Sequence, residues 1–308
     1  MSSLVPLTPG PDPLSLICTV GGDNLPYTYY LSFANLSFKI LSDEEILSRD
    51  SFADFFCSEC SFDFLICCHI SDTPITLPQQ KSLFSRNNRE YFQNGNIRDV
   101  YYASTAPGEY YAHRRFDFIN NRIDITFSPD AKNKLRFRLV LNTFGIEDCA
   151  VQKSSVVFHA SFIDYFGRGV LFTGKSGVGK STQARLWNEY KNTEIINGDK
   201  AFLYFDKDNA YVSGLPFSGS SGISKNKALK LFAVVSLEQS EINEAAALTP
   251  MDTFRTLINS SYFTPIDTES VTSVLENIAK KIKACRLKCT PDYVACDILQ
   301  KFLEEETK

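Results

Sequence analysis

Apolar and polar residues alternate with a period of two along much of the first half of the chain. The apolar positions there are rich in Phe, Tyr, Ile and Val, and Gly, Asn and Pro residues separate the segments. The segments expected to be strands are PYTYYLSF (26–33), LSFKIL (36–41), FDFLICCHI (62–70), RRFDFINNRIDITF (114–127) and LRFRLVLNTF (135–144). This pattern predicts a β-rich region over residues 1–150, arranged as a sandwich or a curved sheet.

The pattern changes near Ser154. Two strand-like segments, SSVVFHASFI (154–163) and GVLFTG (169–174), lead into a glycine-rich loop, and a helix is expected from Ser181 to about Tyr190. Further strand-like segments follow, namely EIINGD (194–199), AFLYFD (201–206), AYVSGLPF (210–217), ALKLFAVVSLE (228–238) and INEAAALT (242–249). Parallel strands need crossovers of a dozen or more residues, which these spacings do not provide. We therefore expect a mixed, largely antiparallel sheet in residues 151–308.

The end of the chain shows helical spacing instead. In TPMDTFRTLINS (249–260), Thr249 is a candidate N-cap and Pro250 fits the first turn of a helix. A second helix is expected where Val271, Val274, Leu275, Ile278 and Ile282 share one face. In TPDYVACDILQKFLEE (290–305), the same start signal precedes a face with Val294, Ile298, Leu299 and Phe302. Together these patterns predict an α+β or α/β protein with C-terminal helices.

Composition narrows the class of protein. The chain has 308 residues, of which 44% are hydrophobic, and a formal net charge of −4. A weakly acidic chain is a poor general binder of nucleic acid or anionic membranes. No apolar run approaches the roughly 18 residues of a membrane span. The N-terminal MSSLVPLTPGPDPLSL lacks the basic start of a signal peptide, so we expect an extended arm or strand lead-in and a cytoplasmic protein.

Nine cysteines raise the question of a metal site or disulfides. An odd number without an export signal favours reduced thiols. The densest cluster is CSECSFDFLICCHI (57–70), in which zinc would accept Cys57, Cys60, Cys67, Cys68 and His69 as ligands. Because a second C-x-x-C pair is missing, we favour an aromatic strand in which cysteine acts as a small buried hydrophobe.

A phosphate-binding loop is the strongest chemical signal in the chain. Gly174, Gly179, Lys180 and Ser181 satisfy the P-loop (Walker A) pattern G-x-x-x-x-G-K-[ST], between an apolar strand and a helix. Backbone N–H groups of such a loop wrap the phosphates, Lys180 should reach the β- and γ-phosphates, and Ser181 should hold Mg²⁺. The expected cofactors are ATP and Mg²⁺. The expected nucleotide-binding residues are Gly174, Lys175, Ser176, Gly177, Val178, Gly179, Lys180, Ser181 and Thr182.

Three side chains near the loop are candidates for the chemistry. Asp199, in IINGDK, lies 19 residues after Lys180 (199 − 180), so a short helix and one strand return it to the loop. There it would hold Mg²⁺ or accept a proton from an attacking hydroxyl; the alternative is that it only ends a strand. His159 and Asp164 lie on the strand and turn before the loop, where antiparallel pairing can place either at the phosphate site. A packed, hydrogen-bonded histidine is an equally good interpretation of His159.

Taken as one unit, these residues resemble the HPr kinase/phosphorylase family, whose nucleotide-binding fold is like that of phosphoenolpyruvate carboxykinase. The family carries a His, an Asp, G-x-G-V-L and G-x-S-G-x-G-K-S. The matching positions here are His159, Asp164, Gly167, Gly169, Val170, Leu171, Gly174, Ser176, Gly177, Gly179, Lys180 and Ser181. YVSGLPFSGSSGISKN and ACRLKCTPDYVACDIL also look like segments of these relatives. The resemblance covers about Ser154 to Leu303 and does not extend to the first half.

The resemblance implies a carboxykinase-like sheet and ATP-dependent phosphorylation of a hydroxyl. In the family, the first acidic residue after the helix acts as base and an adjacent second one helps to hold metal. Asp199 matches the first, but Lys200 stands at the second position. One carboxylate then serves as base or as metal ligand, and His159 or Asp164 fills the other role. The departure also leaves open a nucleotide-binding protein without phosphotransfer.

Two further lysines lie downstream of the loop, and the phosphate acceptor has several candidate classes. Lys225 and Lys227 follow a segment with Gly219 and Gly222, so they form either a mobile basic loop over the phosphates or a solvated turn. The first hypothesis is a kinase acting on a hydroxyl of a protein, peptide or small molecule. The second is a nucleotide sensor that signals through the first half. Carboxykinase activity is less favoured because no basic cluster for a small acid is seen. HPr kinase is a hexamer, so a homo-oligomer is a further expectation.

Overall fold

The computed structural model of the chain describes residues 25–47 and 50–305. The expected N-terminal arm and Cys18 lie outside these residues. The chain divides into two compact units. The first holds residues up to 30, 38–48 and 61–144, and the second, called here the loop unit, holds 31–37, 49–60 and 145–308. Within the loop unit, Asn226 Nδ2 donates hydrogen bonds to the carbonyl oxygens of Ser32 (2.8 Å) and Asp54 (2.9 Å).

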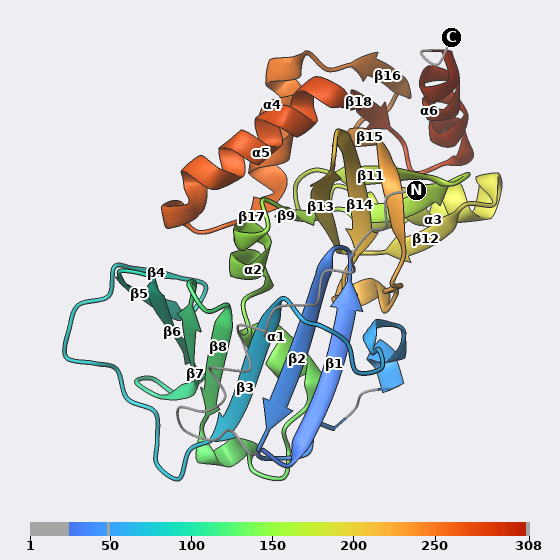
Figure 1. The fold of residues 1–308 in the computed structure, drawn as a ribbon. Helices are drawn as coiled ribbons and strands as arrows, with labels where there is room; N and C mark the ends of the chain where they lie inside the picture. Colours follow the sequence, from blue (N-terminus) through green and yellow to red (C-terminus); the bar gives the residue numbers. More distant parts are fainter. Residues whose placement is uncertain (1–24, 48–49, 306–308) are drawn as a thin grey trace, which may run out of the picture. The chain divides into compact units, whose positions relative to one another are not determined.

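The first half of the chain forms an eight-stranded mixed sheet. Its strands are β1 (Tyr27–Phe33), β2 (Leu36–Ser42), β3 (Phe64–Ile70), β4 (Phe84–Arg86), β5 (Arg89–Asn94), β6 (Ile97–Ala103), β7 (Tyr110–Asp117) and β8 (Arg122–Phe127). They lie in the order β1-β2-β3-β8-β7-β6-β5-β4 (Figure 1). The pairings of β3 with β2 and β8 are parallel, and those from β8 to β4 are antiparallel. The prediction of a β-rich region is confirmed as one sheet rather than a sandwich.

One segment expected as a strand is a helix. LRFRLVLNTF forms α1 (Phe137–Thr143). Alternation of Leu and Arg suggested a period of two, and the buried Leu135 and Phe137 keep it. From Phe137 onward the buried apolar residues are Phe137, Val140, Leu141 and Phe144, which is helical spacing. Phe144 makes an edge-to-face contact with Phe38 of β2 at a centroid distance of 5.4 Å, and the Tyr102 hydroxyl of β6 donates to the carbonyl oxygen of Thr143 at 2.7 Å. The helix therefore packs on the sheet.

The second half of the chain forms a ten-stranded mixed sheet. Its strands are β9 (Val156–His159), β10 (Ser161–Tyr165), β11 (Arg168–Thr173), β12 (Glu194–Asn197), β13 (Lys200–Asp206), β14 (Asn209–Gly214), β15 (Ala228–Gln239), β16 (Glu244–Ala247), β17 (Ser261–Tyr262) and β18 (Lys283–Cys289). The order is β12-β10-β11-β15-β14-β13-β9-β17, with β18 between β15 and β16. Only the β11–β15 and β15–β18 pairings are parallel among these strands of the described chain. This confirms the predicted mixed, largely antiparallel sheet.

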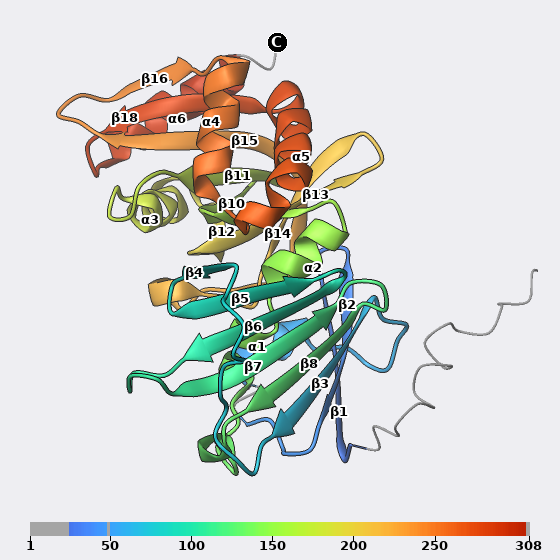
Figure 2. The ribbon, with the colours of Figure 1, turned by 90° about the vertical axis from the view of Figure 1, so that its left-hand side faces the viewer.

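Helices cover both faces of this second sheet. The helices of the loop unit are α2 (Ile146–Gln152), α3 (Lys180–Lys191), α4 (Pro250–Ser260), α5 (Thr268–Lys281) and α6 (Tyr293–Glu305). Figures 1 and 2 show α4 and α5 on one face and α3 and α6 on the other. The two cores use alternate residues of the same strand: Leu171 packs with the α4/α5 side, and Val170 and Phe172 pack with the α3/α6 side. Burial on both faces explains the nearly continuous apolar sequence of β11.

The start of α4 follows the expected signal, whereas α6 begins at Tyr293 and Asp292 Oδ1, not Thr290, accepts from the N–H groups of its first turn; the buried face of α6 differs too. The Thr249 side chain accepts a hydrogen bond from the Asp252 N–H at the start of α4, as an N-cap does. The buried residues of α6 are Ala295, Cys296, Leu299 and Leu303. Val294, which we expected on this face, is 37% exposed. The buried face of α6 is therefore rotated relative to the expected one. Ala295 and Cys296 are part of it, and a search for large apolar residues does not find such small side chains.

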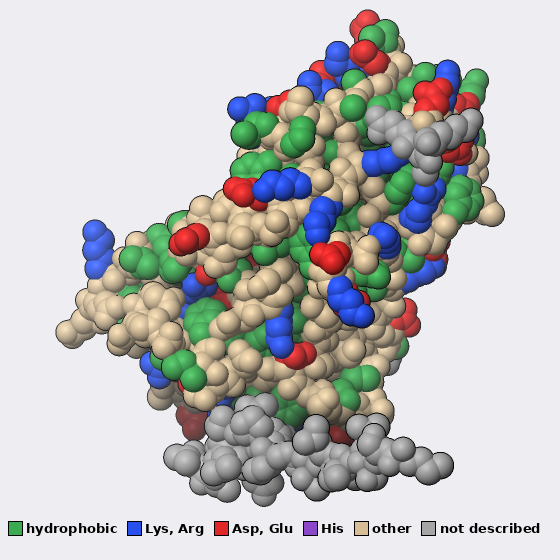
Figure 3. Space-filling model, turned by 45° about the horizontal axis from the view of Figure 1, so that its top comes forward, with side chains coloured by type: hydrophobic (Ala, Val, Ile, Leu, Met, Phe, Trp, Pro, Cys, Tyr) green, Lys and Arg blue, Asp and Glu red, His purple; other side chains and the backbone are tan. Residues whose placement is uncertain are grey.

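No helix in the described ranges is both long and apolar enough to cross a membrane. Figure 3 shows one face of the molecule, on which Lys and Arg side chains are interspersed with Asp and Glu. This distribution agrees with the small net charge of −4. Positively and negatively charged side chains are therefore mixed on that face.

Candidate functional site

The glycine-rich loop joins β11 to α3, and its backbone conformation depends on three glycines. Gly174, Gly177 and Gly179 have φ values of +140°, +78° and +108°, a region that side chains disfavour. A Cβ on Gly174 would also lie 3.1 Å from a Val178 methyl carbon and 3.2 Å from the Leu237 carbonyl oxygen. The free N–H groups of the first turn of α3 follow directly. The loop thus presents N–H donors at the end of β11.

Lys180, the first residue of α3, points back into the loop. Its Nζ donates hydrogen bonds to the carbonyl oxygens of Gly174 (3.2 Å) and Lys175 (3.3 Å). Burial lowers the pKa of the Lys180 ammonium, and the negative charge of Asp199 opposes this shift. The ammonium is thereby held at the centre of the loop, where it can exchange carbonyl partners for phosphate oxygens. Lys175, Ser176 and Gly177 are exposed, whereas Val178 and Thr182 are half-buried.

Asp199 lies in a tight connection between β12 and β13. The buried Asn197 side chain holds this connection: its Oδ1 accepts from the N–H groups of Asp199 (2.9 Å) and Lys200 (3.0 Å). Its Nδ2 donates to the Leu215 carbonyl oxygen at 2.8 Å. Sequence reasoning missed Asn197, although an Asn two residues before a turn residue is a recognisable Asx-turn signal. The position of the Asp199 carboxylate is therefore set by a buried amide.

His159 lies beside Asp199. In the β9–β13 pairing His159 is opposite Lys200. Its Nδ1 lies 3.1 Å from the Asp199 carbonyl oxygen and 3.6 Å from Asp199 Oδ1. Burial and the nearby positive charge of Lys180 lower the pKa of His159, outweighing Asp199, which raises it. A neutral imidazole with Nδ1–H as donor fits this geometry.

Ser181 faces the same connection. Its Oγ donates to the Gly198 carbonyl oxygen at 3.4 Å, and the same oxygen accepts from Ser161 Oγ at 3.0 Å. The structure therefore brings His159, Lys180, Ser181 and Asp199 together. A hydroxyl and one carboxylate fit Mg²⁺, which usually takes one or two protein oxygens and completes its shell with phosphate oxygens and water. Among the residues described, no three His, Cys, Asp or Glu side chains form a metal-binding group by themselves.

Lys200 places a second cation next to Asp199 in the chain. Its Nζ lies 4.7 Å from the ring centroids of both Phe217 and Tyr262. Attraction to the two ring faces fixes the ammonium between them. Burial raises the pKa of Tyr262 to about 12, with smaller contributions from Asp199 and Glu147, so this ring stays neutral. Where the resembling family has a second carboxylate, this chain holds a positive charge.

A cleft of about 780 Å³ opens beside the loop. Gly174 to Val178 and His159 line one side, the end of β15 and Arg286 of β18 another, and Thr256, Asn259 and Ser260 of α4 the third. This volume suits a small organic ligand such as a nucleotide. The cleft lies at the carboxyl ends of the parallel strands β11 and β15, where α/β sheets commonly bind ligands. Sequence reasoning missed Arg286, which no motif marks.

Asp164, Lys225 and Lys227 are not brought to the loop. Asp164 pairs with Gly169, at the end of the β10–β11 hairpin opposite to Thr173, where the loop begins. Lys227 Nζ lies 2.7 Å from Asp164 Oδ2 and 2.7 Å from Glu194 Oε2, and Lys225 Nζ lies 2.6 Å from Glu194 Oε1. The two lysines are therefore occupied by carboxylates. The expected roles of Asp164 in catalysis and of the lysines over the phosphates find no geometric support.

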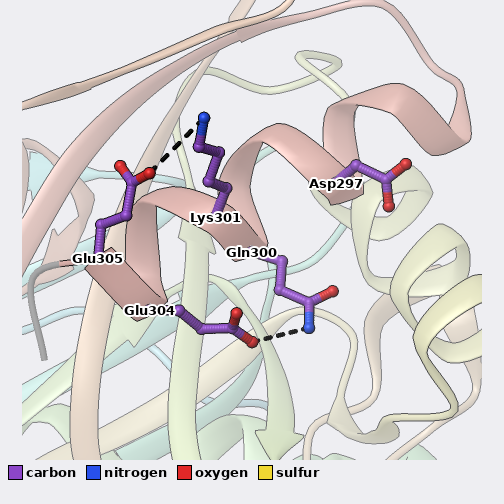
Figure 4. Close-up of a pocket in the computed structure, with 5 residues that line it drawn as sticks. All are labelled: Asp297, Gln300, Lys301, Glu304 and Glu305. Carbon is purple, nitrogen blue, oxygen red and sulfur yellow. Dashed lines mark hydrogen bonds and ion pairs between the residues drawn. The ribbon is translucent and has the colours of Figure 1, made fainter.

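A second hollow and the cysteines lie outside this site. A depression of about 360 Å³ lies along α6 and is lined by Asp297, Gln300, Lys301, Glu304 and Glu305. Figure 4 shows these side chains, of which Gln300 bonds to Glu304 and Lys301 pairs with Glu305. The residues that line it include no residue of the glycine-rich loop, no histidine and no aromatic residue. Cys67 and Cys68 are buried in β3, and Cys57 and Cys60 are exposed, with their sulfur atoms 3.6 Å apart. Cys67 packs with Leu41 and Leu65, as the hydrophobic interpretation predicted.

Comparisons with known proteins leave the family open. No protein-family model and no curated protein matches the chain. Among solved structures, the structure of the Hpr(Ser) kinase/phosphatase from Coxiella burnetii aligns over 49% of this chain and 93% of its own, at 12% identity and a TM-score of 0.30. A TM-score this low does not establish a common fold. The function of the chain must therefore be inferred from the residues of the site.

Proposed function

We propose that the loop unit binds ATP with Mg²⁺ and transfers the γ-phosphate to a hydroxyl group of a protein, a peptide or a small molecule. The observation that carries this proposal is the convergence of Lys180, Ser181, His159 and Asp199 at the end of β11, beside a cleft of about 780 Å³. A phosphate loop alone supports any nucleotide-binding protein. A carboxylate and an imidazole beside it support transfer to a hydroxyl.

Each residue has a role that its contacts permit. The loop N–H groups and Lys180 bind the β- and γ-phosphates, as the free N–H groups at the start of α3 and the inward ammonium suggest. Asp199 accepts the proton of the attacking hydroxyl. His159 holds the Asp199 main chain through Nδ1–H and, being neutral, leaves the carboxylate charge intact. Lys200 neutralises charge that develops on the phosphoryl group.

Mg²⁺ would supply charge neutralisation at the phosphate oxygens when bound. The Ser181 hydroxyl would hold it, and the Asp199 carboxylate is the second available oxygen ligand. With Lys200 at the neighbouring position, Asp199 is the one carboxylate of the 198–200 connection. Replacing Asp199 by Asn distinguishes its two roles. Nucleotide affinity retained with transfer lost identifies the base; loss of Mg²⁺-dependent affinity identifies the ligand.

A direct test compares Lys180→Ala with Lys191→Ala, at the other end of the same helix. Lys191 forms an ion pair with Asp297, whereas Lys180 donates to carbonyl oxygens of the loop. We expect Lys180→Ala to abolish ADP formation from ATP and Lys191→Ala to retain it, both measured with purified protein and a coupled ADP assay. Wild-type turnover in Lys180→Ala would refute the assignment.

A nucleotide sensor without transfer is the second candidate, favoured by Lys200 at the position where the resembling family has an acidic residue. Labelled ATP, purified protein and a cell extract separate the two. Label on a discrete acceptor supports the kinase. Tight binding with neither label transfer nor ADP release supports the sensor.

A further inference from the structure

A serine-containing turn packs directly against the candidate base. The turn runs from Ser218 to Gly222 between β14 and β15 and contains the 3-10 segment Gly219–Ser221. A Cβ built on Gly219 would lie 2.6 Å from Asp199 Cβ and 2.8 Å from Asp199 Cγ. Only hydrogen at this position allows the turn to approach so closely. The backbone of the turn is therefore in contact with the Asp199 side chain.

Ser221 makes the second contact of this turn. A Cβ built on Gly198 would lie 2.0 Å from Ser221 Oγ and 2.5 Å from Ser221 Cβ, so the Ser221 side chain occupies the space that a side chain at 198 would fill. The Gly198 carbonyl oxygen in turn accepts the hydrogen bond of Ser181 Oγ at 3.4 Å. Ser221 therefore packs on Gly198, which directly precedes the candidate base Asp199. The carbonyl oxygen of the same Gly198 accepts from Ser181, the hydroxyl expected to hold Mg²⁺.

We propose that Ser221 is an intramolecular phosphate acceptor, so that the protein phosphorylates itself in this turn. This inference rests on the proposed kinase function and names an acceptor for it. Ser221 is exposed, and its hydroxyl donates to the Ser218 carbonyl oxygen at 2.7 Å. The same oxygen accepts a hydrogen bond from the Ile223 N–H at 3.2 Å. Phosphorylation requires the hydroxyl to leave both partners by rotation about the Cα–Cβ bond, between staggered rotamers.

The chemical step conserves atoms and charge. The Ser221 oxygen bonds to the γ-phosphorus of ATP while the bond from that phosphorus to the bridging oxygen breaks. ADP leaves with the electron pair of the broken bond. The seryl proton passes to the Asp199 carboxylate and then to solvent. Lys180 at the loop and Lys200 between its two aromatic rings provide positive charge for the phosphoryl group in transit.

Ser224 offers a matched control three residues later. Its hydroxyl donates to the Leu215 carbonyl oxygen and the residue is half-buried. The three atoms nearest to a Cβ built on Gly198 belong to Ser221 and Ser218, and Ser224 is not among them. Ser224→Ala therefore removes a nearby hydroxyl without removing the proposed acceptor.

The experiment incubates the full chain with Mg²⁺ and ATP, and measures intact mass, the phosphorylated residue by peptide mapping, and ADP release. We expect one phosphoryl group on Ser221, lost in Ser221→Ala and in Asp199→Asn, retained in Ser224→Ala, and formed at a rate independent of protein concentration. Mapping of the wild-type protein answers the question even if a variant misfolds.

The possible outcomes distinguish failure of this inference from failure of the proposed kinase function. ADP release without phosphate on Ser221, or phosphate only on another residue, overturns the inference and leaves the kinase standing. A first-order rate constant for phosphorylation that rises with protein concentration overturns the intramolecular step. Nucleotide binding with neither ADP nor phosphoprotein overturns the inference. The proposed function falls with it only if labelled ATP also leaves no label on any acceptor in a cell extract.

Discussion

His159 Nδ1 lies 3.1 Å from the carbonyl oxygen of Asp199 and 3.6 Å from its carboxylate oxygen Oδ1. The imidazole is therefore bonded to the main chain of the residue whose side chain is the candidate base. Thr173, the last residue before the phosphate loop, donates its hydroxyl to the His159 carbonyl oxygen at 3.0 Å. Hydrogen bonds therefore connect Thr173 to His159 and His159 to the main chain of Asp199.

The protonation of His159 should appear in the pH dependence of stability. Burial lowers its pKa below the ordinary 6.5, so the unfolded chain binds the proton more tightly than the folded chain. The stabilising contribution of neutral His159 is present above pH 6.5 and is lost as the pH falls toward the folded pKa. We expect wild-type stability to fall more steeply below pH 6.5 than that of His159→Gln. Denaturant unfolding followed by fluorescence of Trp187, the sole tryptophan, measures this; parallel pH profiles would contradict it.

Asp164 and Asp199 should separate cleanly as variants. Asp164→Asn loses the ion pair with Lys227 but keeps an oxygen for the Gly167 N–H, so its unfolding free energy should fall by only about 1 kcal/mol. ADP release should stay at the wild-type rate. Asp199→Asn should suppress transfer with little change in stability. Loss of turnover in Asp164→Asn would restore the catalytic role that sequence reasoning gave it.

Lys200→Met tests whether the charge between Phe217 and Tyr262 serves phosphoryl transfer. Methionine keeps an apolar chain between the rings and removes the ammonium. We expect nucleotide affinity to change little and the transfer rate to fall roughly a hundredfold, as for the loss of one preorganised charge partner. Lys207→Met, in the β13–β14 turn, is the control. An unchanged rate with lower stability would assign Lys200 a packing role alone.

Leu257 and Met251 of α4 make a matched pair for the core on the cleft side of the sheet. Leu257 is fully buried and Met251 is 61% exposed. Leu257→Ala should lower the free energy of unfolding by about 2–5 kcal/mol because it leaves a cavity under the helix. Met251→Ala should change it by about 0.5 kcal/mol or less. Urea unfolding of both variants measures the difference, and equal effects would mean that α4 does not anchor through Leu257.

Much of the fold could be predicted because local signals and packing agreed. The strands of the loop unit carry β-branched and aromatic residues over short runs, and the loop motif placed the start of α3 within one residue. LRFRLVLNTF failed because alternation of Leu and Arg imitates a strand, while burial of Phe137, Val140, Leu141 and Phe144 requires a helix. In such short segments tertiary packing decides between the two periods.

Site residues that lie close to the loop in the sequence could be predicted. Residues whose position depends on the pairing register of distant strands could not. Lys180 and Ser181 follow from the motif, and Asp199 from the length of one helix and one strand. Asp164 does not lie where we expected. The β10–β11 hairpin turns between Tyr165 and Arg168, so Asp164 lies at the turn end of the hairpin and the loop begins at the other end. Arg286 reaches the cleft only through parallel pairing of β18 with β15, over a sequence separation that no local pattern reports.

The loop unit is not contiguous in the gene. Residues 31–37 and 49–60 belong to it, and the two carbonyl acceptors of Asn226 come from chain 172 and 194 residues earlier. A recombination event that joined a new partner at residue 145 would therefore deliver the phosphate loop without part of its own scaffold. The first half of the chain therefore carries segments that complete the loop unit, and a cut at residue 145 would separate them from it.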